Sequence, residues 1–263
     1  MTQLAVVGGG KMGQALVTGL LEAGWASPDE LSVVEVAEKR RAGLVTSLDG
    51  VDVRADVPAC DGAVVAVKPG DVGGACQALA LAGVRRVLSI AAGVPLVKLE
   101  GWLGDEVAVV RAMPNTPALV GAGAAAIAPG AAATEDDLAW AESILAAVGT
   151  VVRVPESLLD AVTGLSGSGP AYVFLVAEAL IDAGVLVGLS RDVSTTLAVQ
   201  TLLGSARLLA ETGSGPEALR AAVTSPGGTT AAGLRALESR AVRAAIAEAV
   251  VAATERSREL GRS

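Results

Sequence analysis

A run of glycines near the start of the chain has a spacing suited to binding phosphate groups. Gly8-Gly9-Gly10-Lys11-Met12-Gly13 carries the G-x-G-x-x-G pattern and stands between an apolar run, Leu4–Val7, and an amphipathic run, Met12–Ala23. In such a turn the first glycine permits a tight bend, the second lets the backbone approach a pyrophosphate, and the third lets helix and strand pack closely. The helix N-terminus adds free N–H groups and the positive end of a dipole. Between a strand and a helix, the pattern predicts that Val7 to Gly13 bind a nicotinamide dinucleotide.

An acidic residue, Glu35, ends the second apolar run, Leu31–Val36, roughly 20 residues beyond the glycine turn. A carboxylate there would accept hydrogen bonds from the adenosine ribose hydroxyls, which favours NAD(H), since it repels a 2′-phosphate. Lys39, Arg40 and Arg41 follow closely and could hold that phosphate, although such residues more often form a solvated helix face. The coenzyme is therefore NADP(H) or NAD(H), and the residues leave the choice open.

Further segments follow predicted strands and are expected at the edge where open α/β sheets bind ligands. They are Ala66-Val67-Lys68-Pro69, Ala91-Ala92-Gly93, and Asn115 within Met113–Pro117. Lys68 either lies beside the pyrophosphate or ribose or is a plain exposed lysine. The small residues of Ala91–Gly93 would let the nicotinamide half pass close to the backbone, and two prolines rigidify the loop that exposes Asn115. We predict coenzyme contacts from all of these segments.

Two later segments combine small residues with hydroxyl groups ahead of predicted helices. They are Ser166–Tyr172 (SGSGPAY) and Ser225–Thr230 (SPGGTT). Each would offer backbone N–H groups and hydroxyls at a helix N-terminus, which suits an anion without any cationic side chain. Simple helix capping is the alternative for either one. Together, beside a dinucleotide fold, they predict a small carboxylate substrate.

Missing residue types exclude several classes of chemistry. The chain has no histidine, which removes Ser-His-Asp catalysis, histidine bases and most zinc enzymes. No lysine follows Lys98, so the C-terminal half supplies no catalytic lysine. The cysteines, Cys60 and Cys76, lack the paired spacing of a metal or disulfide framework, and we expect no metal site and a reduced compartment. The net charge of −8 argues against a nucleic-acid partner.

The first 155 residues alternate short apolar runs with helical patterns, which predicts a parallel sheet with crossover helices. The predicted strands are Leu4–Val7, Leu31–Val36, Ala63–Val67, Arg86–Ile90, Val107–Arg111 and Val151–Val154. Beyond Pro155 we predict only helices: Gly169–Val187, Asp192–Glu211, Gly215–Ala222, Thr229–Glu238 and Val242–Leu260. We therefore divide the chain into a dinucleotide-binding domain, 1–155, and a helical domain, 156–263.

The helix after Pro170 is apolar on nearly every side, with Glu178 and Asp182 as its only charges. A helix of this kind must be covered all round. Because a small helical domain can hardly do so alone, we predict a subunit interface, with a central helix in a monomeric bundle as the alternative. The two carboxylates argue against a membrane span. Leu4–Val7 runs straight into glycines with no basic flank, so we expect no signal peptide and a cytoplasmic protein.

Five ordered motifs resemble those of the pyrroline-5-carboxylate reductase family. They are Asp160–Tyr172 (DAVTGLSGSGPAY), Ser225–Thr230, Arg111–Pro117 (RAMPNTP), Ala66–Pro69 (AVKP) and Ser89–Gly93 (SIAAG). The resemblance in order and spacing extends over essentially the whole chain, and it is far more specific than the glycine turn.

This resemblance implies NAD(P)H-dependent reduction of the C=N bond of 1-pyrroline-5-carboxylate to L-proline, the last step of proline biosynthesis. It implies a Rossmann domain followed by an all-α dimerisation domain, similar to the C-terminal domain of 6-phosphogluconate dehydrogenase, in homodimers that also assemble into decamers. The substrate residues implied are Glu156, Ser225, Gly227, Gly228, Thr229 and Thr230. Thr230 would hydrogen-bond the ring nitrogen and act at most as a proton relay, since the iminium form accepts hydride directly.

Two residues depart from the family pattern. Ala222 replaces an asparagine that some members use near the coenzyme, and Glu35 occupies a position that often holds a small hydroxyl residue in NADPH-preferring members. Other readings are a β-hydroxyacid dehydrogenase, disfavoured by the missing C-terminal lysine, and a deazaflavin-dependent NADP reductase, disfavoured by Ser225–Thr230. A catalytically silent dinucleotide-binding regulator is the alternative from a different class.

Overall fold

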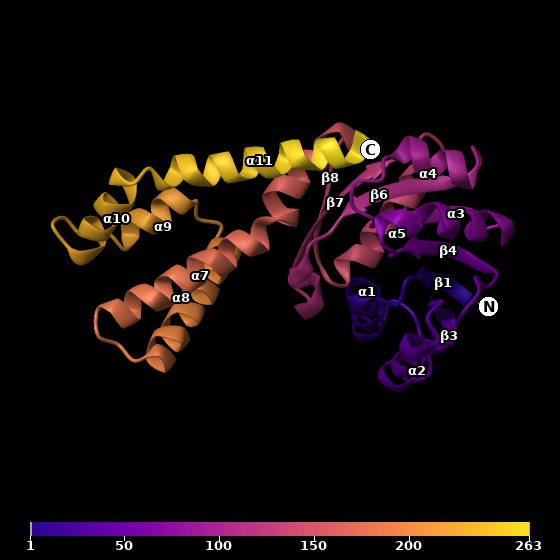
Figure 1. Ribbon diagram of the computed structural model, residues 1–263, viewed down its shortest axis with the longest axis horizontal. Coiled ribbons are helices and arrows are strands. Elements are labelled where there is room, and N and C mark those ends of the chain that lie inside the picture. Colours follow the sequence, from indigo (N-terminus) through magenta and orange to yellow (C-terminus); the bar gives the residue numbers. More distant parts are fainter. Residues whose placement is uncertain (1, 263) are drawn as a thin grey trace. The chain divides into compact units, whose positions relative to one another are not determined.

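The protein forms two compact units. A computed structural model describes residues 2–262, and of Arg262 only the backbone (Figure 1). One unit comprises the chain up to Ser168 together with the stretch from Val251 onward, and the other comprises Gly169–Val250. The predicted fold class, a Rossmann domain followed by a helical domain, is confirmed by their architecture.

The first unit contains one sheet of eight strands among the described residues, in the order β3-β2-β1-β4-β5-β6-β7-β8. The strands are β1 (Thr2–Val7), β2 (Leu31–Val34), β3 (Asp52–Arg54), β4 (Cys60–Val65), β5 (Arg86–Ser89), β6 (Ala108–Met113), β7 (Gly123–Pro129) and β8 (Gly149–Arg153). Strands β1 to β6 are mutually parallel, β7 is antiparallel to β6, and β8 is parallel to β7. The chain therefore reverses its direction across the sheet between β1 and β4, the switch point at which such sheets bind ligands.

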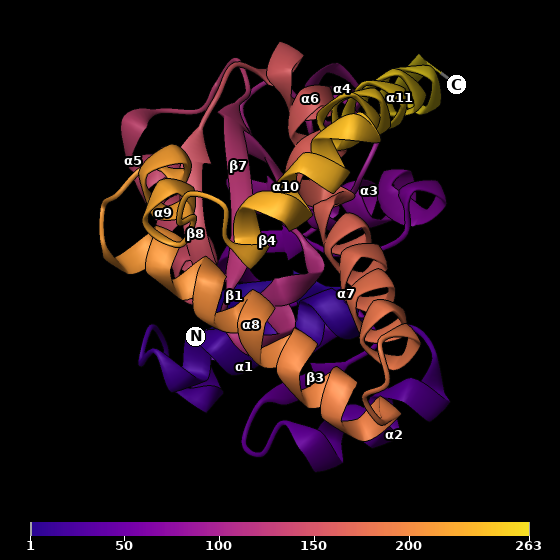
Figure 2. The ribbon, with the colours of Figure 1, turned by 90° about the vertical axis from the view of Figure 1, so that its left-hand side faces the viewer.

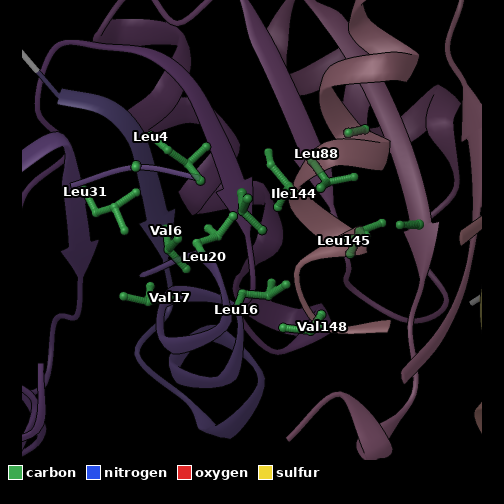
Figure 3. Close-up of a cluster of buried hydrophobic side chains, with 14 of the residues drawn as sticks. Leu4, Val6, Leu16, Val17, Leu20, Leu31, Leu88, Ile144, Leu145 and Val148 are labelled. Atoms are coloured by element: carbon green, nitrogen blue, oxygen red, sulfur yellow. The ribbon is translucent and has the colours of Figure 1, made fainter. Parts of the chain in front are cut away.

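Helices cover both faces of this sheet. They are α1 (Lys11–Glu22), α2 (Glu38–Ser47), α3 (Val72–Leu81), α4 (Leu96–Leu103), α5 (Glu135–Ala146) and the short α6 (Leu159–Val162). Alternate residues of β1 point to opposite faces, as the pleat of a strand requires. Leu4 and Val6 join a cluster with α1, α2 and α5 (Figure 3), whereas Ala5 and Val7 join one with α3 and α4. Burial on both faces explains why the parallel strands are continuously apolar.

Two strands were missing from the sequence prediction, β3 and β7, and the sheet is not wholly parallel. Strand β7 has the sequence GAAAIAP, and alanine has low intrinsic strand propensity. Only the short helix Thr116–Val120 precedes β7, so no crossover helix brings it back parallel to β6. Packing of Ala126 and Ala128 against Leu159 of α6 fixes a strand that propensity does not mark.

The second unit is helical, as predicted. It contains α7 (Gly169–Leu186), α8 (Arg191–Glu211), α9 (Pro216–Ala222), α10 (Thr229–Ser239) and the start of α11 (Val242–Arg262). Helices α7 and α8 pack against each other as a hairpin (Figures 1 and 2). Gly184 makes this close packing feasible, because a Cβ at Gly184 would come within 2.5 Å of the Ser194 hydroxyl.

Ser166–Tyr172 is not a loop, which corrects the prediction of an anion site there. Thr163–Gly167 forms a turn of π-helix that continues α6, and Ser168 keeps a helical backbone up to the start of α7. A continuous helix has no free N-terminus at this place, so its N–H groups are not available to a ligand. Proline is common in the first turn of a helix, so Pro170 suggested a helix start. Helical turns precede Pro170, and the glycines and serines of this segment did not indicate them.

Helix α7 is apolar, and none of its residues is buried within the described chain. Phe174 and Leu175 are 62% and 65% exposed. The helical stretch Glu156–Leu186 is 31 residues long and, by length and composition alone, apolar enough to cross a membrane. The monomeric-bundle alternative is disfavoured, because packing against α8 leaves no residue of α7 buried among the described residues.

The compact units divide at Ser168 and Val251, whereas the predicted domain boundary lies at residue 155. Helix α6 packs against β6 and β7, which holds the segment after Pro155 to the sheet. The end of α11 returns to the same unit, where the Ser257 hydroxyl donates to the Asp160 carboxylate at 2.6 Å. Packing between segments far apart in the sequence does not change the composition, so the boundary between the units could not be predicted from it.

Helix α3 offers a matched test of the core. Leu79 is fully buried and Leu81, two residues on, is 91% exposed. Leu79→Ala is expected to lower the free energy of unfolding by about 2–5 kcal/mol through lost burial and a cavity. Leu81→Ala is expected to stay within about 0.5 kcal/mol. Urea denaturation of both variants checks this, and equal losses would contradict the described packing.

Candidate functional site

The carboxyl ends of the strands bring the predicted coenzyme segments to one edge of the sheet. The hydrogen-bond ladder continues past the strands and ties their loops together. The N–H of Gly8 donates to Val34 O at 2.8 Å, and the N–H of Ala66 donates to Val7 O at 2.8 Å. The N–H of Ile90 likewise donates to Val65 O at 3.0 Å. The segments after β1, β2, β4 and β5 are therefore held side by side at the switch point.

The glycine turn has the geometry that a dinucleotide needs. Gly8 has φ +114°, and a Cβ there would lie 2.6 Å from the carbonyl oxygen of Ala66. A Cβ at Gly13 would overlap the carbonyl oxygen of Gly8, so α1 packs against the turn only because residue 13 is glycine. At Gly10 a Cβ would meet nothing within 4 Å. That space lies at the N-cap of α1, where no side chain caps the helix, so the first N–H groups fit a pyrophosphate.

Glu35 lies beside this turn, as predicted from its place after the second strand. Its side chain is only 4% exposed, and its Oε2 would come within 3.4 Å of a Cβ at Gly9. Oε1 accepts from the N–H of Ala37 at 2.9 Å, and Oε2 lies 3.2 Å from Nε of Arg40. The sequence did not indicate this ion pair, which partly neutralises the carboxylate. Arg41 instead donates to the carbonyl oxygens of Glu35 and Val36, at 2.8 and 2.7 Å.

The segments after β4 and β5 present backbone and small side chains at the same edge. In the first, Lys68 and Pro69 are exposed, and Ala66 and Val67 are partly buried beside Gly8. In the second, Ala91 is buried, Ala92 is exposed and Gly93 has φ +73°. These exposures agree with a surface that a ligand could cover.

Asn115 has a different position from the one expected for an exposed coenzyme contact. It is 9% exposed, its Nδ2 donates to Ser166 O at 3.0 Å, and its Oδ1 accepts from the N–H of Ala124 at 2.8 Å. Its amide thus ties the loop after β6 to β7 and to the π-helical turn. Met12 is partly buried, while Lys11 is exposed at the start of α1.

Glu156 is held by two donors. Its Oε1 accepts from Nη1 of Arg111 at 2.8 Å and from the N–H of Leu96, at the start of α4, at 2.7 Å. Arg111 is 12% exposed and lines a cavity of about 300 Å³ with Gly93, Asp160 and Arg258. The sequence alone did not indicate this role of Arg111. A charged residue inside the apolar strand AVVRAM was the signal that could have found it.

The Ser225–Thr230 segment, in the second unit, is a turn followed by a helix N-terminus, as predicted. Gly227 has φ +70°, and the N–H of Gly228 donates to Ser225 O at 3.1 Å. Gly228 is the N-cap of α10 and provides no side-chain cap. The first N–H groups of α10 therefore have no side-chain cap, and Thr229 and Thr230 are its first two residues.

The thiols are poor nucleophiles. Burial raises the pKa of Cys76 to about 11 and also raises the pKa of Cys60. Both therefore stay protonated near neutral pH, and the thiolate is the reactive form. Among residues 2–262, no group of three or more carboxylates or thiols could hold a metal ion.

A groove of about 500 Å³ runs along α1 and shares only Lys11 with the predicted coenzyme residues. Its other walls come from the Ala118–Gly121 turn and from Ala147 and Val148. The strand ends define the candidate site better than this groove does, because the dipole and the free N–H groups of α1 face the carboxyl edge.

Two family models match the chain. Residues 156–260 match the pyrroline-5-carboxylate reductase dimerisation family, and residues 3–93 match the family described as NADP oxidoreductase coenzyme F420-dependent. The second match covers only part of the sheet domain, whereas the dimerisation match includes the Ser225–Thr230 loop.

Curated relatives extend the similarity to the full length. Pyrroline-5-carboxylate reductase of Methanosarcina acetivorans is 46% identical, with 99% of this chain and 98% of the relative covered. The enzyme of the same name from Synechocystis sp. is 46% identical with the same coverage.

Solved structures agree with these matches. The pyrroline-5-carboxylate reductase of Coxiella burnetii superposes with a TM-score of 0.94 at 37% identity, over 100% of this chain and 99% of that one. The Plasmodium falciparum pyrroline carboxylate reductase with NADP bound has a TM-score of 0.84 at 32% identity, over 99% and 98% of the two chains.

The glycine turn yields a paired prediction. Gly13→Ala is expected to lower the free energy of unfolding by about 1–3 kcal/mol, because its Cβ overlaps a backbone carbonyl. Gly10→Ala is expected to change stability by less than about 1 kcal/mol. It should weaken coenzyme binding by about tenfold or more, since its methyl group occupies the approach to the helix N-terminus. Thermal unfolding and coenzyme titration check both variants. Unchanged coenzyme affinity in Gly10→Ala would contradict a coenzyme site at the glycine turn.

Proposed function

This chain belongs to the pyrroline-5-carboxylate reductase family. We propose that the loops at the carboxyl ends of its strands bind the coenzyme and that the Ser225–Thr230 loop binds the substrate. It is an NAD(P)H-dependent oxidoreductase that reduces 1-pyrroline-5-carboxylate to L-proline, the last step of proline biosynthesis. The observation that carries the assignment of sites is the open space over Gly10 beside an uncapped helix N-terminus.

We assign coenzyme binding to the segments gathered at the carboxyl edge. They are Val7–Gly13, Glu35, Ala66–Pro69, Ala91–Gly93 and Asn115. The turn would hold the pyrophosphate through N–H groups of α1, and Glu35 would lie at the adenosine ribose. Asn115 would act through its loop backbone, since its amide is engaged within the chain. NADH or NADPH, when bound, supplies the hydride.

The N-terminus of α10 suits the substrate carboxylate. Ser225, Gly227, Gly228, Thr229 and Thr230 would surround it, with backbone N–H groups donating to the carboxylate oxygens. The Thr230 hydroxyl, one residue into the helix, would hydrogen-bond the ring nitrogen. This arrangement needs no cationic side chain, in keeping with the absence of lysine after Lys98.

Glu156 completes the proposed substrate set. Oε1 is fixed by Arg111 and by the N–H of Leu96, which orients the carboxylate. A carboxylate held in this way can contact the substrate or the product. Arg111 is thus a positioning residue for Glu156.

A chain without histidine fits this reaction. A cyclic imine is basic enough to carry its own proton near neutral pH, and its iminium form accepts hydride without a strong general base. The protein would then contribute mainly by positioning the imine carbon and excluding water. Thr230 would serve as a proton relay at most.

We further propose the organisation of the protein in the cell. Residues 1–155 bind coenzyme, and residues 156–263 bind substrate and pair two chains as a homodimer, which can assemble into decamers. The dimerisation family match over residues 156–260 and the uncovered apolar surface of α7 support this. A partner chain, rather than lipid, would cover α7, whose charged residues Glu178 and Asp182 are costly in a bilayer. We place the protein in the cytoplasm, without nucleic-acid partners.

Thr230 provides the test of the proposed chemistry. Wild type should oxidise NADH or NADPH when given racemic 1-pyrroline-5-carboxylate. Thr230→Ala should lower kcat about 10- to 100-fold, the effect of one lost hydrogen bond to a charged group, without reaching background. Thr230→Ser keeps the hydroxyl and should recover most of the activity. Full activity in Thr230→Ala would contradict the role, and no oxidation by wild type would contradict the function.

The exposed surface of α7 gives a prediction about assembly. Leu175→Asp places a charge in the proposed interface, where desolvating it is unfavourable, and should shift the protein toward monomers. Leu81→Asp, on the more exposed Leu81 of α3, is the control and should leave the assembly unchanged. Light scattering coupled to gel filtration measures the mass. An unchanged mass for Leu175→Asp would contradict dimerisation through α7.

A further inference from the structure

Glu35 and Arg40 form an ion pair at the position of the adenosine ribose. The Glu35 side chain is 4% exposed, whereas that of Arg40 is 60% exposed. Nε of Arg40 approaches Oε2 of Glu35 at 3.2 Å, and Oε1 is taken by the N–H of Ala37. The carboxylate is thus fixed by the start of α2, while the arginine that partners it reaches into solvent.

The neighbouring basic residues are not equivalent to Arg40. Arg41 is partly buried, and its Nη1 donates to the carbonyl oxygens of Glu35 and Val36, so it closes the end of β2. Lys39 is exposed and is a point charge without a planar donor fork. Arg40 approaches Glu35 through Nε and is 60% exposed, so its terminal N–H groups can reach a ligand from solvent. Of these three basic residues, Arg40 is the one that forms an ion pair with the Glu35 carboxylate.

We propose that Glu35 and Arg40 act as an exchangeable pair that lets this one site accept both NADH and NADPH. The inference rests on the coenzyme site proposed above. With NADH, Oε2 of Glu35 accepts the ribose hydroxyl while Arg40 stays paired. With NADPH, the 2′-phosphate takes the guanidinium of Arg40, which offers two parallel N–H donors to phosphate oxygens. Glu35 then keeps its hydrogen bond from Ala37.

This pairing explains how a buried carboxylate can tolerate a 2′-phosphate. An unpaired Glu35 would repel the phosphate, which is the ordinary basis of selection for NAD(H). Arg40 offsets that charge, and the N-terminus of α2, which has no side-chain cap, adds the positive end of a dipole. Selection between coenzymes would therefore depend on the pair and not on Glu35 alone.

The test compares binding of NAD⁺ and NADP⁺, which differ only in the 2′-phosphate, by isothermal calorimetry at low and moderate salt. Arg40→Gln should weaken NADP⁺ binding by about tenfold or more and leave NAD⁺ within about threefold. Lys39→Gln, the matched control, should leave both within about threefold. Glu35→Gln, which keeps an acceptor for the N–H of Ala37, should weaken NAD⁺ and leave NADP⁺ as tight or tighter. The ratio of kcat/KM with NADPH to kcat/KM with NADH should fall in Arg40→Gln and rise in Glu35→Gln.

Several outcomes would contradict the proposed role of Glu35 and Arg40 in coenzyme selection. These are equal losses of both coenzymes in Arg40→Gln, a loss of NADP⁺ binding in Lys39→Gln instead, or unchanged selectivity in Glu35→Gln. Thermal unfolding of each variant separates a folding defect from a binding defect. If wild type bound neither coenzyme, the proposed coenzyme site itself would fail, which is distinguishable from a change in selectivity among the variants.

Discussion

The close approach of Gly13 to the carbonyl of Gly8 sets the path of the chain from β1 into α1. A Cβ at residue 13 would overlap that carbonyl, so this turn from β1 into α1 requires glycine there. The path aims the N-terminus of α1 at the switch point between β1 and β4. The loops after β2, β4 and β5 are fastened to the same edge by continued ladder hydrogen bonds. The proposed coenzyme site is therefore built mainly from backbone, which accounts for its small residues.

The chemistry of this family needs little beyond positioning, and the residues of the chain agree. Histidine is absent, the thiols are held protonated by burial, and no lysine lies beyond Lys98. What the chain offers instead are helix N-termini without side-chain caps, at Gly10 and at Gly228. Both suit anions, one in each compact unit. An iminium substrate carries its own proton, so such a site can promote hydride transfer without a strong base.

Local patterns predicted most of the fold and much of the candidate site. The glycine turn, the helices beyond Pro155 and the position of Glu35 follow from spacing and periodicity within short segments. Strand β7 was missed because its alanines carry no strand signal, and the π-helical turn was taken for a loop because its glycines and serines are typical of loops. The ion pair of Glu35 with Arg40, and the anchoring of Glu156 by Arg111, depend on how side chains meet. Only the folded chain shows them.

The most direct test traces the hydride from C4 of the nicotinamide to the product. The protein would be given 1-pyrroline-5-carboxylate and NADH or NADPH carrying two deuterium atoms at C4 of the nicotinamide, and the product would be analysed by mass spectrometry and NMR. We expect L-proline with a single deuterium on the ring carbon that was doubly bonded to nitrogen. Proline without deuterium, or coenzyme oxidation without proline, would contradict it.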